Sequence, residues 1–107
     1  MRQGDVCWVH SPDRSGRRPA LVLTRSSAIG YLSSVTIAQV TTTIRGTPAE
    51  VVLSEADGMP QRCVASLDNV QTVRKTHFGP LITHLSADRM RQIRSAIEFA
   101  LGFNEMI

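Results

Sequence analysis

The side chains best suited to chemistry in this 107-residue chain are an arginine and a threonine at the ends of two predicted strands. Arg18 precedes Pro19 and the apolar run 20–24, and a proline favours an extended backbone for the residue before it. Thr41 closes the run 35–41, which is rich in β-branched residues. If these strands pair in antiparallel fashion, the end of one lies near the start of the other. A guanidinium and a hydroxyl would then face one pocket, where both could donate hydrogen bonds to an anion.

Each of these residues also has a simpler interpretation. Arg18 could be a solvated arginine in a turn, and Thr41 could be present for its strand propensity. Other kinds of site lack the residue patterns that they need. The three histidines are isolated and Gly16 does not belong to a glycine-rich phosphate loop, so we expect neither a metal nor a cofactor. No Gly-x-Ser-x-Gly segment is present to support a serine nucleophile.

The composition is that of an ordinary globular protein, for which we expect one domain over residues 1–107. Lys75 is the only lysine among twelve basic residues, and arginine forks match phosphate geometry, although genome composition can also enrich arginine. Cys7 and Cys63 lie far apart in predicted strands, which favours buried free thiols. The sequence shows neither a signal pattern nor an apolar run of membrane length, so we expect a cytoplasmic protein that does not contact membranes.

The elements that must position Arg18 and Thr41 are short predicted strands separated by turn residues. The strands are expected over 4–10, 20–24, 35–41, 49–53, 62–67 with a continuation over 69–73, and 81–85. A loop is expected over 11–16 and a possible helical turn within 25–34. These strands and the single helix that follows them predict a mainly β fold, either a small barrel or a curled sheet.

That helix has clear start and stop signals. Ser86 is a good N-cap, and Gly102 is placed to end the helix in the left-handed conformation. An apolar stripe with helical spacing is predicted to pack on the sheet, formed by Met90, Ile93, Ile97 and Leu101.

Taken in order, these segments resemble the MazF/PemK family, the ribonuclease toxins of bacterial toxin–antitoxin pairs. The matching segments cover almost the whole chain and are RQGDVCWV (2–9), RRPALVL (17–23), VTIAQVT (35–41), VASLDNVQTV (64–73) and the terminal helix (85–102). The resemblance implies an SH3-like barrel of the MazF, Kid and CcdB kind. It also implies a homodimer and a cognate MazE-like antitoxin that fills the RNA groove. The activity it implies is sequence-specific, metal-independent cleavage of single-stranded RNA.

By motif position, the family's catalytic arginine and threonine fall on Arg18 and Thr41, and Asp68 matches a carboxylate that some relatives use. Cleavage without a metal would use the neighbouring 2′-OH as nucleophile, giving a 2′,3′-cyclic phosphate and a 5′-OH. An arginine stays protonated, so Arg18 is better suited to stabilising phosphoryl charge than to acting as a simple base. Trp8 could stack on a base, but we expect it in the core. RNA contacts are expected from a set of residues: Arg14, Arg17, Thr42, Thr43, Arg45, Gln71 and Arg74.

Two departures from the family pattern keep alternatives open. The loop over 11–16 lacks the family's glutamate, and Ser66 stands where some relatives have a second catalytic arginine. The chain could therefore be a member that binds RNA or antitoxin without cutting. Another alternative is a non-enzymatic, CcdB-like toxin that binds DNA gyrase through its last residues, 103–107, although the expected pattern is not seen there. The RNA sequence that is recognised does not follow from these residues.

Overall fold

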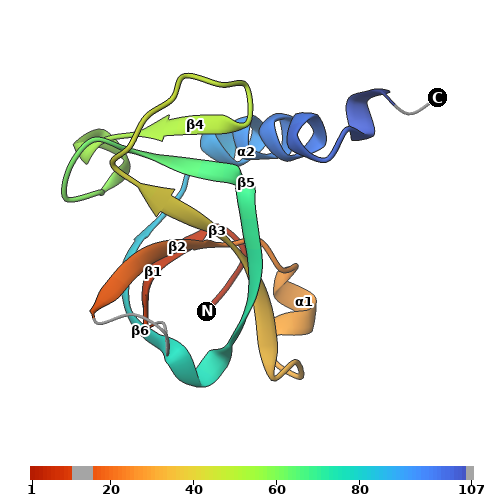
Figure 1. Cartoon of the computed structure of the whole chain (residues 1–107). Coiled ribbons are helices and arrows are strands. Elements are labelled where there is room, and N and C mark those ends of the chain that lie inside the picture. The colour runs from red at the N-terminus through yellow and green to blue at the C-terminus, as the bar shows by residue number, and fades with distance from the viewer. Residues whose placement is uncertain (11–15, 106–107) are drawn as a thin grey trace.

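The computed structural model describes residues 1–10 and 16–105, in which six antiparallel strands curl into a half-barrel with one long helix at one end (Figure 1). Along the sheet the strands run in the order β4-β5-β3-β2-β1-β6. Their bounds are β1 Asp5–His10, β2 Arg17–Val22, β3 Ser34–Thr41, β4 Glu50–Leu53, β5 Cys63–Arg74 and β6 Phe78–His84. The helices are α1 Ser26–Ile29 and α2 Ala87–Ala100, with short 3-10 turns η1 Glu55–Asp57, η2 Lys75–His77 and η3 Phe103–Glu105. The predicted mainly β fold with a C-terminal helix is confirmed, in its curled-sheet form.

A bulge in β5 produces much of the curl. β5 pairs with β3 in two stretches, and the register shifts between the pairs Ala38–Val70 and Gln39–Ser66, so residues 67–69 have no partner on β3. Bulges bend the strand that carries them, and β5 turns sharply in Figure 1. The first half of β5 also pairs with β4, beside α2, whereas the second half runs towards the other end of the molecule.

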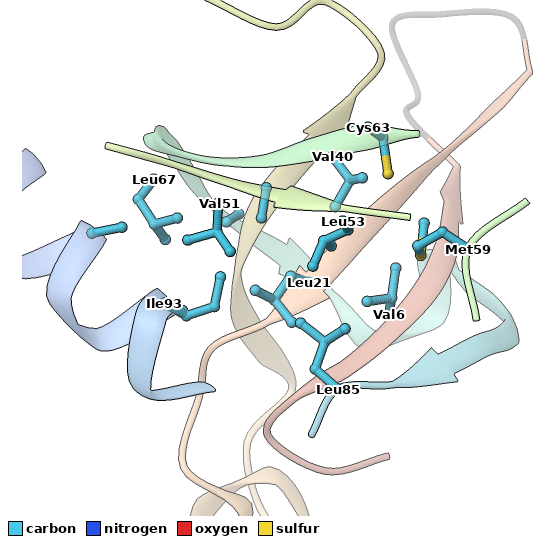
Figure 2. Packing of buried hydrophobic residues seen from close by; sticks show 13 residues of the cluster. Val6, Leu21, Val40, Val51, Leu53, Met59, Cys63, Leu67, Leu85 and Ile93 are labelled. Carbon is cyan, nitrogen blue, oxygen red and sulfur yellow. The ribbon is translucent and has the colours of Figure 1, made fainter. Parts of the chain in front are cut away.

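Side chains pack on both faces of the central strands, because alternate residues of a strand point to opposite faces. Leu21 and Val40 belong to the cluster that α2 covers, together with Leu53, Leu67 and Ile93 (Figure 2). A second cluster takes the alternate residues of β2 and β3, including Ala20, Val22, Val35 and Ile37. The apolar run in β2 predicted burial on both faces, and the two clusters confirm it.

Two strands start three residues earlier than the sequence predicted. β2 begins at Arg17 instead of residue 20, so Pro19 is its third residue. The ladder between β2 and β3 ends at this end with the pair Ala20–Gln39, so Pro19 has no partner on β3 and needs no N–H towards that strand. On its other side Pro19 pairs with Trp8 of β1. β6 begins at Phe78 instead of residue 81, because it already lies opposite Val9 of β1 there.

The terminal helix begins and ends at the predicted residues. Ser86 Oγ accepts a hydrogen bond from the Arg89 N–H at 3.2 Å, and Gly102 has a φ of +76°. Three members of the predicted stripe contact the core: Met90, Ile93 and Ile97. The prediction for the fourth member, Leu101, is wrong, because this residue lies beyond the last helical residue and is 54% exposed. In the described part of the chain, no helix has the length and apolar character needed to cross a membrane.

Asp57 ties the segment after β4 to α2 and β6. Its carboxylate accepts hydrogen bonds from the Ser54 N–H and from Arg89 Nε, both at 2.9 Å, and its carbonyl oxygen accepts one from Thr83 Oγ1 at 2.8 Å. The hydrogen bond from Arg89 is the main reason that the pKa of Asp57 is lowered. Gly58 follows with a φ of +89°, and a Cβ at that position would collide with the Thr83 side chain.

Candidate active site

Arg18 and Thr41 lie at neighbouring strand ends. β2 and β3 are antiparallel, and continuing their register two residues beyond the pair Ala20–Gln39 sets Arg18 opposite Thr41. Arg18 is exposed and Thr41 is half-buried. Both residues line the same two cavities, of about 330 and 280 Å³, which we call the first and second cavities. The structure therefore brings the guanidinium and the hydroxyl together, as antiparallel pairing predicted.

The Thr41 hydroxyl is oriented by the backbone two residues later in the chain. The Thr43 N–H donates a hydrogen bond to Thr41 Oγ1 at 3.2 Å. A hydroxyl that accepts one hydrogen bond still has its hydrogen to donate, so Thr41 can act as a donor towards an anion. The next residue, Thr42, is exposed and lines the second cavity.

The first cavity combines an apolar wall with polar side chains. Residues of the second core cluster line it, together with Arg18, Thr41, Gln39 and Gln71. Gln71 was among the predicted RNA contacts, and the structure places it here. Gln39 was missed, although its position two residues before Thr41 in β3 puts both side chains on the same face of the sheet.

The second cavity contains an aromatic side chain covered by an arginine. Arg17 Cζ lies 4.5 Å from the centroid of the Trp8 ring, within range of a cation–π interaction. Trp8 is only half-buried, so the prediction that it belongs to the core was wrong. It lies opposite Pro19 near the end of the β1–β2 ladder, on the face of β1 opposite to Val9 of the second cluster. Cys63 also lines this cavity, where burial raises its pKa and keeps the thiol protonated.

A third cavity, also of about 330 Å³, is lined by Thr41 and by other polar or charged residues. The bulge in β5 brings Asp68 and Asn69 to it. Asn69 Nδ2 donates to Ser66 Oγ at 2.9 Å, which holds the buried serine that departs from the family pattern. Asp68 is exposed, and its carboxylate has no hydrogen-bond partner within residues 1–10 and 16–105. Asp68 and Thr41 therefore line the same cavity, with the carboxylate oxygens of Asp68 open to a hydrogen-bond donor.

A carboxylate holds the loop that forms the other wall of the third cavity. Glu50 Oε1 accepts hydrogen bonds from the N–H groups of Arg45 and Gly46 at 3.0 and 2.8 Å. Glu50 was not identified from the sequence, because a glutamate at the start of a strand usually reads as an exposed charge. Its contacts fix the loop that brings Thr43 and Arg45, two of the predicted RNA contacts, to the cavity.

We call the three cavities around Thr41 the cleft. Two of the predicted RNA contacts are not part of it. Arg14 lies outside the described residues. Arg74 pairs with Ser34 at the opposite end of β3 from Thr41. Seven residue steps of about 3.3 Å separate Ser34 from Thr41, a distance of roughly 23 Å. Arg74 therefore lines none of the three cavities.

One histidine has a partner that the sequence did not predict. His84 Nδ1 lies 2.9 Å from Oδ1 of the buried Asp5, which connects β6 to β1. Both cysteines are free and buried, as predicted, and burial raises the pKa of the Cys7 thiol as it does for Cys63. Across residues 1–10 and 16–105, the His, Cys, Asp and Glu side chains form no group of three that could hold a metal ion.

These features define a small β-sheet protein with a largely polar cleft, in which an arginine and a threonine lie at adjoining strand ends. Residues 2–101 match the family described as PemK-like, MazF-like toxin of type II toxin–antitoxin system. The chain is 39% identical over 100 residues to the probable endoribonuclease MazF5 of Mycobacterium tuberculosis. The aligned region covers 92% of this chain and 91% of that protein. The chain belongs to the PemK-like, MazF-like toxin family.

Solved structures agree with this assignment. The Mycobacterium tuberculosis toxin MazF-mt6 superposes with a TM-score of 0.84 at 33% identity, covering 92% of this chain and 96% of that chain. A chain of a MazE-MazF crystal structure from Deinococcus radiodurans superposes with a TM-score of 0.79 at 25% identity, covering 95% of both chains. The half-barrel with its terminal helix is thus the fold of known MazF toxins.

Proposed function

We propose that this protein is an endoribonuclease toxin that cleaves single-stranded RNA without a metal or other cofactor. The observation that carries the proposal is that Arg18 and Thr41 line the same two cavities at adjoining strand ends. Family membership supports it, because the relative named above is called a probable endoribonuclease. The RNA sequence that is cut would be selected by the cavities on either side of this pair.

The chemistry follows from placing a phosphodiester between Arg18 and Thr41. The neighbouring 2′-oxygen attacks phosphorus, a 2′-O–P bond forms, and the P–O5′ bond breaks, which leaves a 2′,3′-cyclic phosphate and a 5′-OH. Negative charge builds on the phosphoryl oxygens in the transition state. The Arg18 fork and the Thr41 hydroxyl donate hydrogen bonds to those oxygens, and oriented donors of this kind stabilise transition states by about 3–4 kcal/mol each.

The proton of the attacking 2′-OH needs an acceptor, and the departing 5′-oxygen needs a proton. We assign the first role to Asp68, which shares the third cavity with Thr41. Glu50 lines that cavity too, but its carboxylate already accepts backbone hydrogen bonds. Arg18 donates a hydrogen bond to the departing 5′-oxygen and stays protonated, while a water molecule gives that oxygen its proton. The proton accepted by Asp68 passes to the hydroxide that remains, which restores the site.

Flanking nucleotides would occupy the cavities beside this pair. In the second cavity, Arg17 and Thr42 are positioned to contact the backbone. Gln71 in the first cavity, and Thr43 and Arg45 in the third, are suited to polar contacts with bases or phosphates. We also propose that the active species is a homodimer in the cytoplasm. A MazE-like antitoxin would block the cleft, by analogy with the MazE-MazF assembly from Deinococcus radiodurans.

The decisive experiment maps cleavage in excess EDTA. The purified protein is incubated with several unrelated long single-stranded RNAs, beside Arg18→Ala and the matched control Arg94→Ala, whose arginine lies on the exposed face of α2. We expect discrete cuts with 5′-OH ends from the wild type and Arg94→Ala. Loss of an oriented donor should slow Arg18→Ala by about 10²–10³-fold, with an unchanged circular dichroism spectrum.

Two results would contradict the proposal. If Arg18→Ala cut as fast as the wild type, Arg18 would have no catalytic role. If no RNA in the set were cut by any of the proteins, with or without Mg²⁺, the enzyme assignment would be abandoned. Cutting that required Mg²⁺ would overturn only the metal-independent mechanism.

A further inference from the structure

Charge is unevenly distributed along this chain. Residues 14–49 and 69–87 contain no Asp or Glu and seven basic residues: Arg14, Arg17, Arg18, Arg25, Arg45, Arg74 and Lys75. The rest of the chain holds all nine acidic residues and only five basic ones. The acid-free segments comprise β2, α1, β3, β6 and the second half of β5. The small net charge of +3 therefore conceals a strongly positive half of the molecule.

Part of this positive charge gathers far from the cleft, around α1 and η2. We call Arg25, Tyr31, Arg74 and Lys75 the distal basic patch. Arg25 Nη2 donates to the Tyr31 hydroxyl at 3.3 Å, and Tyr31 is 72% exposed. Lys75 Nζ donates to the Ile29 carbonyl at 2.7 Å, which holds η2 against α1. An exposed aromatic ring beside guanidinium and ammonium groups combines the two features that single-stranded nucleic acids bind, a stacking surface and positive charge.

An exposed strip of β5 connects the distal basic patch to the cleft. From Val70 to Arg74, β5 pairs with β3 on one side, and no other strand in the described part of the chain pairs with it on the other. Val70, Gln71 and Thr72 are exposed. Gln71 lines the first cavity with Arg18, and the strip ends at Arg74 in the patch. The cleft and the distal basic patch thus lie at opposite ends of this exposed strip of β5, separated by about the length of β3.

We propose that the distal basic patch binds the single-stranded RNA that continues from the cleft along β5. A base stacks on Tyr31, and Arg25 and Arg74 contact phosphates. The roughly 23 Å along β3 lies within the reach of a strand several nucleotides long, and OB-fold proteins, which are of similar size, bind about 4–16 nucleotides. RNA fits this surface better than an acidic protein segment does, because the strip starts at the cleavage site and includes a bare aromatic face. The inference rests on the proposed ribonuclease function.

The test compares a short RNA with a long one. Both contain the mapped cleavage sequence, and the long RNA adds eight unstructured nucleotides on the 5′ or the 3′ side. The variants are Arg25→Gln/Arg74→Gln and Tyr31→Ala. The control Arg91→Gln/Arg94→Gln removes two exposed arginines from the acidic half. Binding is also measured by fluorescence anisotropy with RNAs that carry 2′-O-methyl at the cleaved position, so that affinity is obtained without cleavage.

For the wild type we expect one extension to lower KM at least tenfold relative to the short RNA. In the patch variants this ratio falls towards one. The slope of log affinity against log salt for the long RNA decreases by about 1.4 when two phosphate contacts are lost, since each single-strand contact contributes about 0.7. The control double variant keeps both the ratio and most of the slope.

The proposal is overturned if the wild type binds and cuts short and long RNAs alike, or if the control variant loses as much as the patch variants. It is also overturned if the patch variants bind the purified cognate antitoxin more weakly while their affinity for long RNA is unchanged. That result would assign the patch to a protein partner. If no RNA is cut, the anisotropy series is run with unmodified short and long RNAs of one arbitrary sequence, and it still tests the patch. Affinity that depends on length and on Arg74 supports the patch, while the proposed cleavage fails on its own.

Discussion

The arginines of α2 and the arginines of the cleft are one residue type in two electrostatic settings. On α2 each arginine has a carboxylate partner: Arg89 with Asp57, Arg91 with Asp88, and Arg94 with Glu98. In the cleft, Arg17 lies over the Trp8 ring instead. In the described part of the chain, no carboxylate lies within 4.0 Å of the guanidinium nitrogens of Arg17, Arg18 or Arg45.

The difference separates arginines that join elements from arginines that can bind a ligand. A guanidinium that is paired with a carboxylate already uses hydrogen-bond donors on that partner, and the negative charge of the partner offsets most of its positive potential. An exposed guanidinium on a rigid strand keeps both, at little cost to stability because water solvates it. The surrounding sequence makes this possible, because β2 and β3 contain no acidic residue at all. Substitutions in the two regions should therefore affect different measurements.

The largest effect is expected from a matched pair of threonines. Thr41→Val removes the hydroxyl donor in the cleft and should lower kcat by about 10²–10³-fold, as expected when one oriented donor to transition-state charge is lost. Thermal unfolding should barely change, because the Thr43 N–H that loses its acceptor is exposed. Thr83→Val removes the hydrogen bond to the Asp57 carbonyl and should do the reverse, lowering stability by about 1 kcal/mol with normal cleavage.

Single-turnover cleavage and urea unfolding of both variants measure this contrast. Thr41→Ser keeps the hydroxyl and should restore most of the rate. Equal losses of activity in Thr41→Val and Thr83→Val would contradict the division between the two regions.

A smaller effect, on stability alone, is expected at the contact between Asp57 and α2. Asp57→Asn should lower the free energy of unfolding by about 1–3 kcal/mol near pH 7, because the carboxylate accepts hydrogen bonds from Arg89 and Ser54. The folded-state pKa of Asp57 is below its ordinary value of 3.8. Its contribution is therefore complete above that pH and is lost as the pH falls through the lowered pKa.

Urea titrations of the wild type and Asp57→Asn between pH 7 and pH 2 test this sign. The difference between the two proteins should shrink as the pH falls below 3.8. A difference that stayed constant over this range would mean that the ionised carboxylate is not what stabilises the contact.

The smallest effect is expected on the exposed face of α2. Arg94 forms an i, i+4 pair with Glu98 at 3.0 Å, and its side chain is 83% exposed. Arg94→Gln should change the free energy of unfolding by less than about 0.5 kcal/mol, and less still in 0.5 M salt. Cleavage and RNA affinity should not change. A clear loss of RNA affinity in this variant would show that the acidic half of the molecule also contacts the substrate.

Local patterns in the sequence were sufficient for the parts of the fold that depend on neighbouring residues. Ser86 and Gly102 predicted both ends of α2, because caps depend on groups within one helical turn. The apolar run of β2 predicted burial on both faces, since strand alternation is itself local. The proximity of Arg18 and Thr41 followed from antiparallel pairing of two successive strands, which leaves few alternatives.

Contacts between residues far apart in the sequence were decided only by the tertiary structure. The bulge at residues 67–69 brings Asp68 to the cleft, and the position of such a bulge depends on how β5 pairs with β3 and β4 together. The same pairing sends Arg74 to the far end of β3. The sequence by itself determined which side chains could serve the chemistry. The register of the sheet decided which of them share a cavity, because a shift of one residue moves every side chain of a strand to the opposite face.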